Sequence, residues 1–374
     1  MKTVWFCLAV GLGLAVAPVP AETRPPLPGS RELSAEMVRK LAEAGDAASQ
    51  YNLGYSYYRG GGRPQDYAAA ALWFRKAAEQ GVFQAQFALA ICYREGHGVT
   101  RDEVEAGRWL RKAADQGDAK AQLLLATCHQ TGRGVPQSVS EAAQWFQKAA
   151  EQGVARAQYE LAVCLREGRG VPKDPAAAAQ WLQRAAEQND ARAQFLLGVH
   201  CEAGDGVPQN YPDAVKHFRA AAAQGLAAAQ YNLGVLCAHG RGVPQDHAEA
   251  VQWFRLAAEQ GDAQAQFNLG LCCEKGQGLK PDLAAAVQWY RRAAEQGDVR
   301  SQLNLGACLA KGQGLARDPV EAYAWFNLAA AAGDANALAA RDSLQKLMTP
   351  EQLAEGQRRA TALAAKVTPP APPR

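Results

Sequence analysis

Apolar and polar positions recur along the chain with a fixed period of 36 residues. In the copy at 226–261, small and apolar residues follow one another at helical spacing, then a Gly-Arg-Gly turn, then a second helical stretch containing Trp253 and Phe254. Apolar residues spaced by three and four positions indicate an amphipathic helix. Glycine just past a helix end takes the left-handed conformation without steric strain. Each copy therefore predicts a helix, a tight turn and a second helix.

The period is kept without insertion or deletion. One glutamine occupies the same position in every copy: Gln50, Gln86, Gln122, Gln158, Gln194, Gln230, Gln266 and Gln302. A constant period of about 20–50 residues is typical of solenoids, in which each unit buries its apolar face against the next. The sequence therefore predicts eight stacked repeats.

A capping residue precedes the second helix of each copy. Asp246 stands at this position, and Glu249 three residues later predicts a capping box. The equivalent residues of the other copies are Asp66, Asp102, Ser138, Asp174, Asn210, Asp282 and Asp318. Pro175 and Pro319 occupy the first helical position, where a missing N–H is tolerated. These residues fix where the second helices begin.

Large and small residues alternate between the two helices of a copy. Tryptophans recur in the second helix, with His217 as the exception: Trp73, Trp109, Trp145, Trp181, Trp253, Trp289 and Trp325. The first helices have small residues at one position: Gly54, Ala90, Ala126, Ala162, Gly198, Gly234, Gly270 and Gly306. We expect the tryptophans to pack against these small residues, because large side chains fill the space that small ones leave. The alternative is a row of aromatic rings that stack on a ligand.

These residues resemble a known family. The segments ASQYNLG at 48–54 and AAQYNLG at 228–234, followed by G-x-G-V and D-x-x-x-A-x-x-W-F-x-x-A-A-x-x-G, are similar to the Sel-one-like repeat, a relative of the tetratricopeptide repeat. The resemblance covers 46–333 and implies an α-solenoid that binds proteins or peptides and usually has no catalytic activity. We therefore expect an all-α protein, a right-handed α-solenoid of eight 36-residue helix-turn-helix repeats with terminal capping helices.

The N-terminal residues predict export. One lysine, an apolar run and a small-residue end make 1–21 a candidate signal peptide, with cleavage after Ala21 or, alternatively, Ala17. The run is shorter than the roughly 20 residues that span a bilayer, and no second apolar run follows. We expect a protein without membrane insertion, exported to the periplasm or secreted after cleavage.

The repeats are flanked by segments of other composition. A proline-rich linker (22–33) precedes a predicted N-terminal capping helix (34–45), which lacks the tryptophan. Beyond the repeats, 334–367 predicts C-terminal capping helices, the second beginning at Thr-Pro-Glu-Gln, and 368–374 is a proline-rich tail. A T-P-E-Q helix of this kind is also similar to the endings of many bacterial members of the family.

Charge does not favour nucleic acid as a partner. The chain has 40 Lys and Arg against 37 Asp and Glu, so no strong net field exists. We expect a monomer whose partner is a protein or peptide.

The cysteines and histidines do not form a ligand set. Cys92, Cys128, Cys164, Cys201, Cys237, Cys272, Cys273 and Cys308 remain after removal of Cys7, about one in each repeat. Equivalent positions of neighbouring repeats should lie about 8–10 Å apart, beyond the roughly 7 Å that a disulfide spans. The cysteine-rich branch of the family places two cysteines per repeat eight positions apart, a pair missing here. We expect buried thiols, with the vicinal Cys272 and Cys273 a doubtful exception, and no metal site.

No catalytic constellation is evident. Ser343 and Lys346 match the Ser-x-x-Lys pattern of penicillin-interacting enzymes, but the companion S-D-N and K-T-G motifs are missing. The G-x-G turns follow helices, whereas phosphate-binding loops follow strands. We expect no enzyme activity and no cofactor.

Positions that vary among the copies are candidates for partner binding, because the family usually binds on the concave face formed by its first helices. A first set is Gln84, Lys120, Arg156, Arg192, Gln264 and Arg300. A second set is Tyr58, Arg94, Gln130, Arg166, Glu202 and Glu274. A third is Asn52, Asn232, Asn268 and Asn304, which could hold an extended peptide backbone or, equally, form hydrogen bonds that fix the angle between repeats. The basic first set favours an acidic partner.

The sequence as a whole favours an exported, non-catalytic scaffold that mediates protein–protein or protein–peptide interaction through its concave face. The alternative is a cell-wall hydrolase or β-lactam-interacting protein of the cysteine-rich branch. A third possibility is a structural spacer attached through its proline-rich ends.

Overall fold

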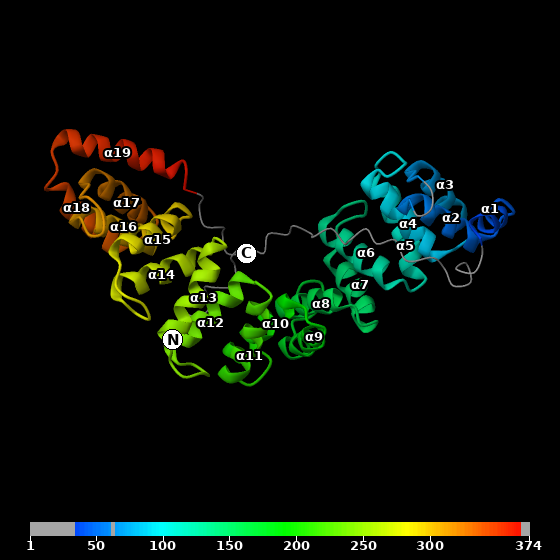
Figure 1. Ribbon diagram of the computed structural model, residues 1–374, viewed down its shortest axis with the longest axis horizontal. Coiled ribbons are helices and arrows are strands. Elements are labelled where there is room, and N and C mark those ends of the chain that lie inside the picture. Colours follow the sequence, from blue (N-terminus) through cyan, green and yellow to red (C-terminus); the bar gives the residue numbers. More distant parts are fainter. Residues whose placement is uncertain (1–33, 61–63, 368–374) are drawn as a thin grey trace. The chain divides into compact units, whose positions relative to one another are not determined.

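The computed structural model describes residues 34–60 and 64–367 of the 374-residue chain. The predicted signal peptide (1–21), linker (22–33) and tail (368–374) lie outside the described residues, as does the middle of the first turn (61–63). All regular structure in the described part is α-helical, and the expected all-α solenoid of eight repeats is confirmed (Figure 1).

Two compact units divide the chain between Asp190 and Ala191. The helices of the first unit are α1 (Ala35–Glu43), α2 (Ala47–Arg59), α3 (Tyr67–Glu79), α4 (Phe83–Glu95), α5 (Glu103–Asp115), α6 (Ala119–Thr131), α7 (Val139–Glu151), α8 (Ala155–Glu167) and α9 (Pro175–Glu187). The second unit contains α10 (Ala191–Ala203), α11 (Tyr211–Ala223), α12 (Ala227–His239), α13 (His247–Glu259), α14 (Ala263–Lys275), α15 (Leu283–Glu295), α16 (Val299–Lys311), α17 (Pro319–Ala331), α18 (Ala335–Gln345) and α19 (Pro350–Ala364). Within each unit, successive helices pack against one another.

The second helices begin at the predicted caps. The carboxylate of Asp246, for example, accepts hydrogen bonds from the backbone N–H groups of Ala248 and Glu249. The expected capping box at Asp246 is wrong. The N–H of Asp246 donates to the carbonyl of Cys237, and Glu249 instead accepts from the indole of Trp253 at 3.1 Å and from Arg219 at 2.9 Å. The carboxylate of Glu249 thus links two second helices.

In six of the turns a glycine lies against the preceding repeat. Gly134 has φ +71°, and a Cβ at this residue would lie 1.9 Å from the carbonyl oxygen of Glu103, at the start of α5. Gly98 makes the same approach to Tyr67, with 2.0 Å to its carbonyl oxygen. The second glycine of the G-x-G turn therefore lets the turn backbone contact the helix before it.

In five repeats the small residue of the first helix is a glycine, and it meets the aromatic residue one position after the tryptophan site, not the residue at that site. A Cβ at Gly234 would lie 2.7 Å from Cε1 of Phe254. The same contact recurs in the pairs Gly54–Phe74, Gly198–Phe218, Gly270–Tyr290 and Gly306–Phe326. Where the small residue is Ala90 or Ala162, the facing position has leucine instead. The expected pairing of tryptophan with the small residue is therefore wrong.

Five of the seven repeat tryptophans stack on a cation of their own helix. Trp145 and Trp325 are buried, and the other five are half-buried. Lys148 Nζ lies 3.9 Å from the ring centroid of Trp145. Equivalent stacks occur in the pairs Trp73–Lys76, Trp109–Lys112, Trp181–Arg184 and Trp289–Arg292. In these five pairs the cation lies over the ring, which is a favourable cation–π contact.

The recurring glutamine joins the two helices of its repeat to the helix before them. Gln122 is 4% exposed, and its Nε2 donates to the carbonyl of Ala114 at 3.1 Å. Its Oε1 accepts from Nε2 of Gln152 at 2.8 Å. The same amide–amide bond occurs in the pairs Gln80–Gln50, Gln116–Gln86, Gln188–Gln158, Gln224–Gln194, Gln260–Gln230 and Gln296–Gln266. Buried amides need partners, which explains why this position does not vary.

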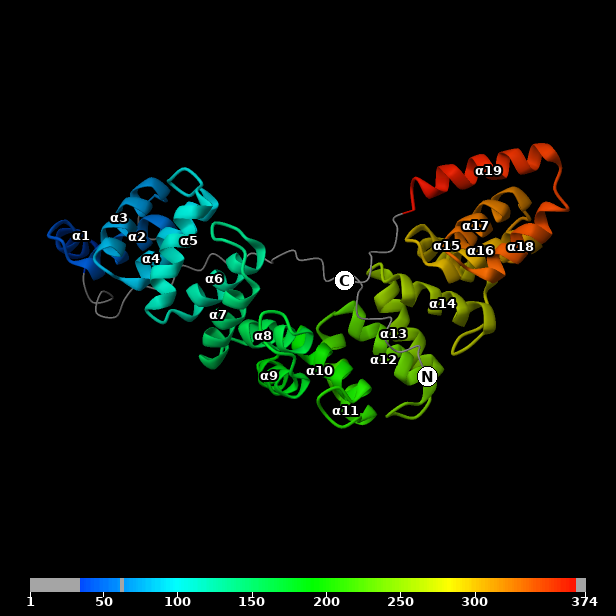
Figure 2. The ribbon, with the colours of Figure 1, turned by 180° about the vertical axis from the view of Figure 1, so that it is seen from behind.

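The ends of the repeats are closed by helices of a different kind. Ser34 caps α1 through a bond from the N–H of Met37. After the eighth repeat, Thr349 and Gln352 form the predicted capping box at the start of α19. α19 packs against α17 and lies beside it in both views (Figures 1 and 2).

Candidate binding surface

Four positions of each first helix form a stripe along one helix face. Positions 48, 52, 55 and 59 of α2 are separated by four, three and four residues, which places them on one helix face. We call these positions and their equivalents in the other repeats the first-helix stripe. Its two ends are accessible: the residues equivalent to Arg59 are all exposed, and those equivalent to Ala48 are exposed or half-buried. The middle is more buried.

The first set of predicted binding residues lies at the N-terminal end of this stripe. Lys120 and Arg300 are exposed, and Gln84, Arg156, Arg192 and Gln264 are half-buried. The guanidinium of Arg300 lies 4.2 Å from the ring centroid of Phe267 and pairs with Asp298 at 2.9 Å. The stripe is therefore accessible and basic at this end, with Lys120 and Arg156 in the first unit and Arg192 and Arg300 in the second.

The asparagines occupy the more buried middle of the stripe. Asn52 is 7% exposed, and the other three are half-buried. Asn232 donates to the carbonyl of Ala228 at 3.1 Å, within its own helix. Asn304 hydrogen-bonds to the hydroxyl of Tyr290, which belongs to the preceding repeat. At Asn304 the structure therefore places a bond between repeats, whereas the bond of Asn232 stays within its own helix.

Tyr290 connects this asparagine with a residue of the second set. Its hydroxyl donates to Oε2 of Glu274 at 2.5 Å. Burial, followed by this carboxylate, raises the pKa of Tyr290. The side chain of Glu274 is thus engaged inside the repeat.

The second set does not share the surface of the first. Tyr58 is 5% exposed, and its hydroxyl lies 3.0 Å from Nδ1 of His97, whose ring stacks on Tyr67 with centroids 4.4 Å apart. Burial raises the pKa of Tyr58 to about 12. The prediction that Tyr58 is free to meet a ligand is corrected, because the residue belongs to the core.

The remaining members of the second set lie half-buried near the turns. Arg94 and Arg166 pair with Glu95 and Glu167 at 2.8 and 2.7 Å. Burial raises the pKa of Glu202, and Gln130 is half-buried. Two of these side chains are thus paired within their own repeats and all are half-buried, so the first set is the better candidate for partner contact.

The eight cysteines in the described part of the chain are free thiols, seven of them buried and Cys128 half-buried. Burial raises the pKa of Cys92 to about 12 and that of Cys128, Cys164, Cys237, Cys272 and Cys308 to about 11. A thiol needs its thiolate form to act as a nucleophile or metal ligand, so these positions favour packing. Among the described residues, no group of three or more His, Cys, Asp or Glu side chains is placed to hold a metal ion.

The Ser-x-x-Lys segment lies on the surface. Ser343 is an exposed residue of α18, and Lys346 is the exposed residue that ends this helix. Covalent catalysis requires a nucleophile held beside its base in a site that excludes water. The surroundings of Ser343 do not provide such a site. Within the described part of the chain, no helix combines the length and apolarity of a membrane span.

Comparison with known proteins agrees with the architecture of eight helical repeats. The family model of the Sel1 repeat matches eight consecutive segments: 47–82, 83–118, 119–154, 155–190, 191–226, 227–262, 263–298 and 299–334. A Sel1 repeat protein from Oxalobacter formigenes is 32% identical, with a TM-score of 0.64, and the match covers 84% of this chain and 90% of that one. A protective antigen of uropathogenic Escherichia coli with an SLR fold is 31% identical, with a TM-score of 0.48, over 88% of this chain and 86% of that one. No curated protein matches.

Proposed function

The chain belongs to the Sel1 repeat family, and on that premise we propose that it is an exported, non-catalytic adaptor that binds a protein or peptide segment along its first-helix stripe. Sel1 repeat proteins are generally protein-interaction scaffolds and generally lack catalytic activity. The family thus supports protein binding as the class of function, and the stripe and the export are the finer parts of the proposal.

One observation carries the choice of surface. The N-terminal end of the stripe is accessible and has a cation in four repeats, Lys120, Arg156, Arg192 and Arg300. In each of these four helices, the two residues that follow the cation are buried in the core. Arginine and lysine at such a surface favour carboxylates, so the proposed partner presents an acidic segment.

A charge-reversal experiment within the first unit tests this surface. The double variant Lys120→Glu/Arg156→Glu should lose capture of the partner in a cross-linking pull-down from the envelope fraction, with the captured protein identified by mass spectrometry. Arg133→Glu/Lys173→Glu is the matched control, because both residues are exposed in turns of the same unit and the change in charge is equal. Helical content should be unchanged in both.

Loss of capture by the stripe variant alone supports the proposal. Equal capture by both variants contradicts it and moves the binding site to the second helices or the tails. Loss of capture by both indicates only long-range charge attraction and also contradicts a stripe-specific site.

Export rests on the apolar run near the N-terminus and the small residues up to Ala21. Expression in a bacterial host should yield a mature protein that begins at Glu22 in the periplasmic fraction or the medium, as measured by mass spectrometry of the intact protein. An unprocessed chain retained in the cytoplasm would contradict export without affecting the proposed binding surface.

A further inference from the structure

The last repeat departs from the glutamine pairing of the other seven. At the end of α17, the position equivalent to the glutamine that donates to the recurring glutamine is Ala332. Gln302 still donates through Nε2 to the carbonyl of Ala294 at 3.2 Å. Among the described residues no donor reaches its Oε1, although Gln302 is only 3% exposed.

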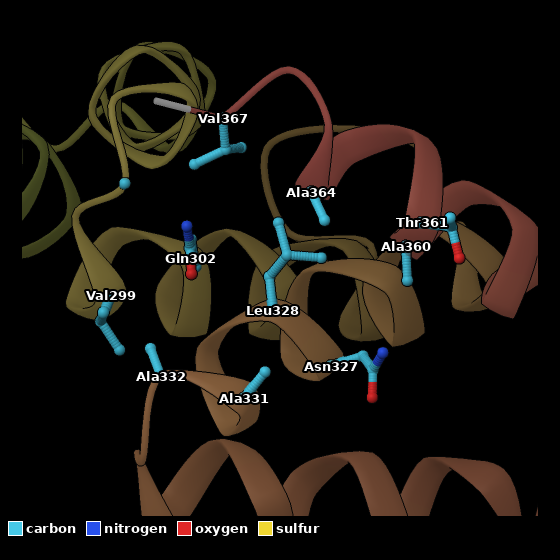
Figure 3. A pocket seen from close by; sticks show the side chains of 11 residues that line it. Val299, Gln302, Asn327, Leu328, Ala331, Ala332, Ala360, Thr361, Ala364 and Val367 are labelled. Carbon is cyan, nitrogen blue, oxygen red and sulfur yellow. The ribbon is translucent and has the colours of Figure 1, made fainter. Parts of the chain in front are cut away.

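A pocket of about 480 Å³ opens at this point, within the second unit. Its lining is contributed by α16, α17 and α19 and is largely aliphatic. The lining residues are Gly297, Val299, Gln302, Asn327, Leu328, Ala331, Ala332, Ala360, Thr361, Ala364 and Val367. Figure 3 shows Ala360, Ala364 and Val367 of the C-terminal segment across from Leu328, Ala331 and Ala332, with Gln302 beside them. The volume falls in the range of roughly 300–1,000 Å³ typical of ligand sites.

The other repeats show which group fits against this acceptor. Nε2 of Gln80 donates both to Oε1 of Gln50, at 2.8 Å, and to the carbonyl of Gly45, at 3.0 Å. Gln152 makes the same two bonds to Gln122 and Gly117, at 2.8 and 3.0 Å. The equivalent acceptors in the last repeat are Gln302 and Gly297, and both line the pocket. A carboxamide nitrogen is therefore the group that this site is built to receive.

We propose that the pocket between α16, α17 and α19 binds a segment of a partner protein that inserts a glutamine side chain flanked by aliphatic residues. The inserted amide takes the place that the side chain of Ala332 would fill if this position carried glutamine, as it does in the other seven repeats. The aliphatic neighbours contact Val299, Leu328 and Val367. In the repeats that carry both glutamines this acceptor receives an amide hydrogen bond, so a donor that reaches Oε1 of Gln302 contributes to affinity and selectivity. This site is separate from the first-helix stripe.

Matched peptides test the chemistry of the pocket. The probe is the pentapeptide acetyl-Leu-Ala-Gln-Ala-Leu-amide, added to the full mature chain and followed by NMR of the methyl groups of Val299, Leu328 and Val367. The comparison peptides replace the central glutamine with methionine, which has a similar shape and no N–H, or with glutamate. We expect saturable binding of the glutamine peptide, with about tenfold weaker binding of the other two, the effect of losing one hydrogen bond.

Two alanine variants locate the site. Ala332→Gln should abolish binding of the glutamine peptide without lowering the melting temperature, since glutamine occupies the equivalent position in seven repeats. Ala339→Gln is the control, because Ala339 is an exposed residue of α18 outside the pocket. It should bind the peptide as the unaltered chain does.

Three results would overturn the proposal: no binding of the glutamine peptide at millimolar concentration, equal binding of the methionine peptide, or unchanged binding by Ala332→Gln. The stripe variant Lys120→Glu/Arg156→Glu should bind the peptide normally, so that failure of the pocket and failure of the stripe give different results.

Discussion

The amide nitrogen of Gln152 lies 2.8 Å from the amide oxygen of Gln122, and this bond joins the C-terminal end of α7 to α6. Gln122 also donates to the carbonyl of Ala114 at the end of α5. A single side chain therefore ties three successive helices together. Its repetition along the chain gives each repeat the same internal geometry.

Replacing Gln122 with leucine should destabilise the protein by about 1–3 kcal/mol, because the carbonyl of Ala114 and the amide of Gln152 both lose a buried partner. The urea midpoint measures this change. Gln144→Leu is the control, since Gln144 is an exposed residue of α7. An equal midpoint for the two variants would show that the glutamine bond adds nothing to stability.

Two turn glycines should differ in their tolerance of alanine. Gly117 has φ +91° and no atom within 4 Å of the place where a Cβ would lie, whereas a Cβ at Gly134 would lie 1.9 Å from the carbonyl oxygen of Glu103. Gly117→Ala should cost about 1–2 kcal/mol from the left-handed backbone alone. Gly134→Ala should cost more than this, because the turn must also move away from α5. Thermal unfolding of both variants decides the order, and a smaller loss at Gly134 would contradict the contact.

The small–aromatic contact between paired helices should respond to compensating changes. Gly234→Ala should destabilise the protein by about 1–3 kcal/mol through overpacking against Phe254. Adding Phe254→Leu should recover part of this loss, because alanine faces leucine at Ala90–Leu110 and Ala162–Leu182. A double-mutant cycle measures the coupling. Additive effects would contradict a direct contact. The third repeat has alanine and phenylalanine at the equivalent positions, Ala126 and Phe146, so the loss caused by Gly234→Ala should be moderate.

The buried tryptophan of the third repeat should be important for stability. Trp145 is 5% exposed, and its replacement by alanine should cost about 3–5 kcal/mol. Lys148→Ala removes only the stacked cation and should cost about 0.5–1 kcal/mol. Denaturation curves of the two variants should therefore differ clearly. If the two variants lost similar amounts of stability, the stacked cation, and not burial of the Trp145 ring, would account for the effect.

Stability should fall in alkaline solution. Burial raises the pKa of Cys92 from its ordinary value of 9.0 to about 12. The folded chain therefore keeps this thiol protonated between about pH 9 and 12 while the unfolded chain loses the proton, so the stability present below pH 9 declines as the pH rises through this range. Urea midpoints measured from pH 7.5 upwards should decline less steeply for Cys92→Ala. An unchanged slope would show that the Cys92 thiol is accessible to solvent in the folded chain.

The recurring residues of the sequence determined the helices and their number. The 36-residue interval, the caps such as Asp66 and Asp102, and the turn glycines act within a few residues of their own positions, and their effects can be read directly from the order of the residues. The family resemblance added the expectation of protein binding.

The tertiary structure decided which side chains of these helices meet. Trp253 and Phe254 are neighbours in sequence, but they point about 100° apart on the helix, and only packing determines that Phe254 faces Gly234. Packing likewise buries Tyr58 and leaves Lys120 exposed, although both occupy positions of a first helix that vary among the repeats. The pocket beside Gln302 also depends on α19, which packs back against α17 after α18. A sequence period fixes the faces of a helix relative to one another, whereas the face that becomes core is fixed by the partner against which the helix packs.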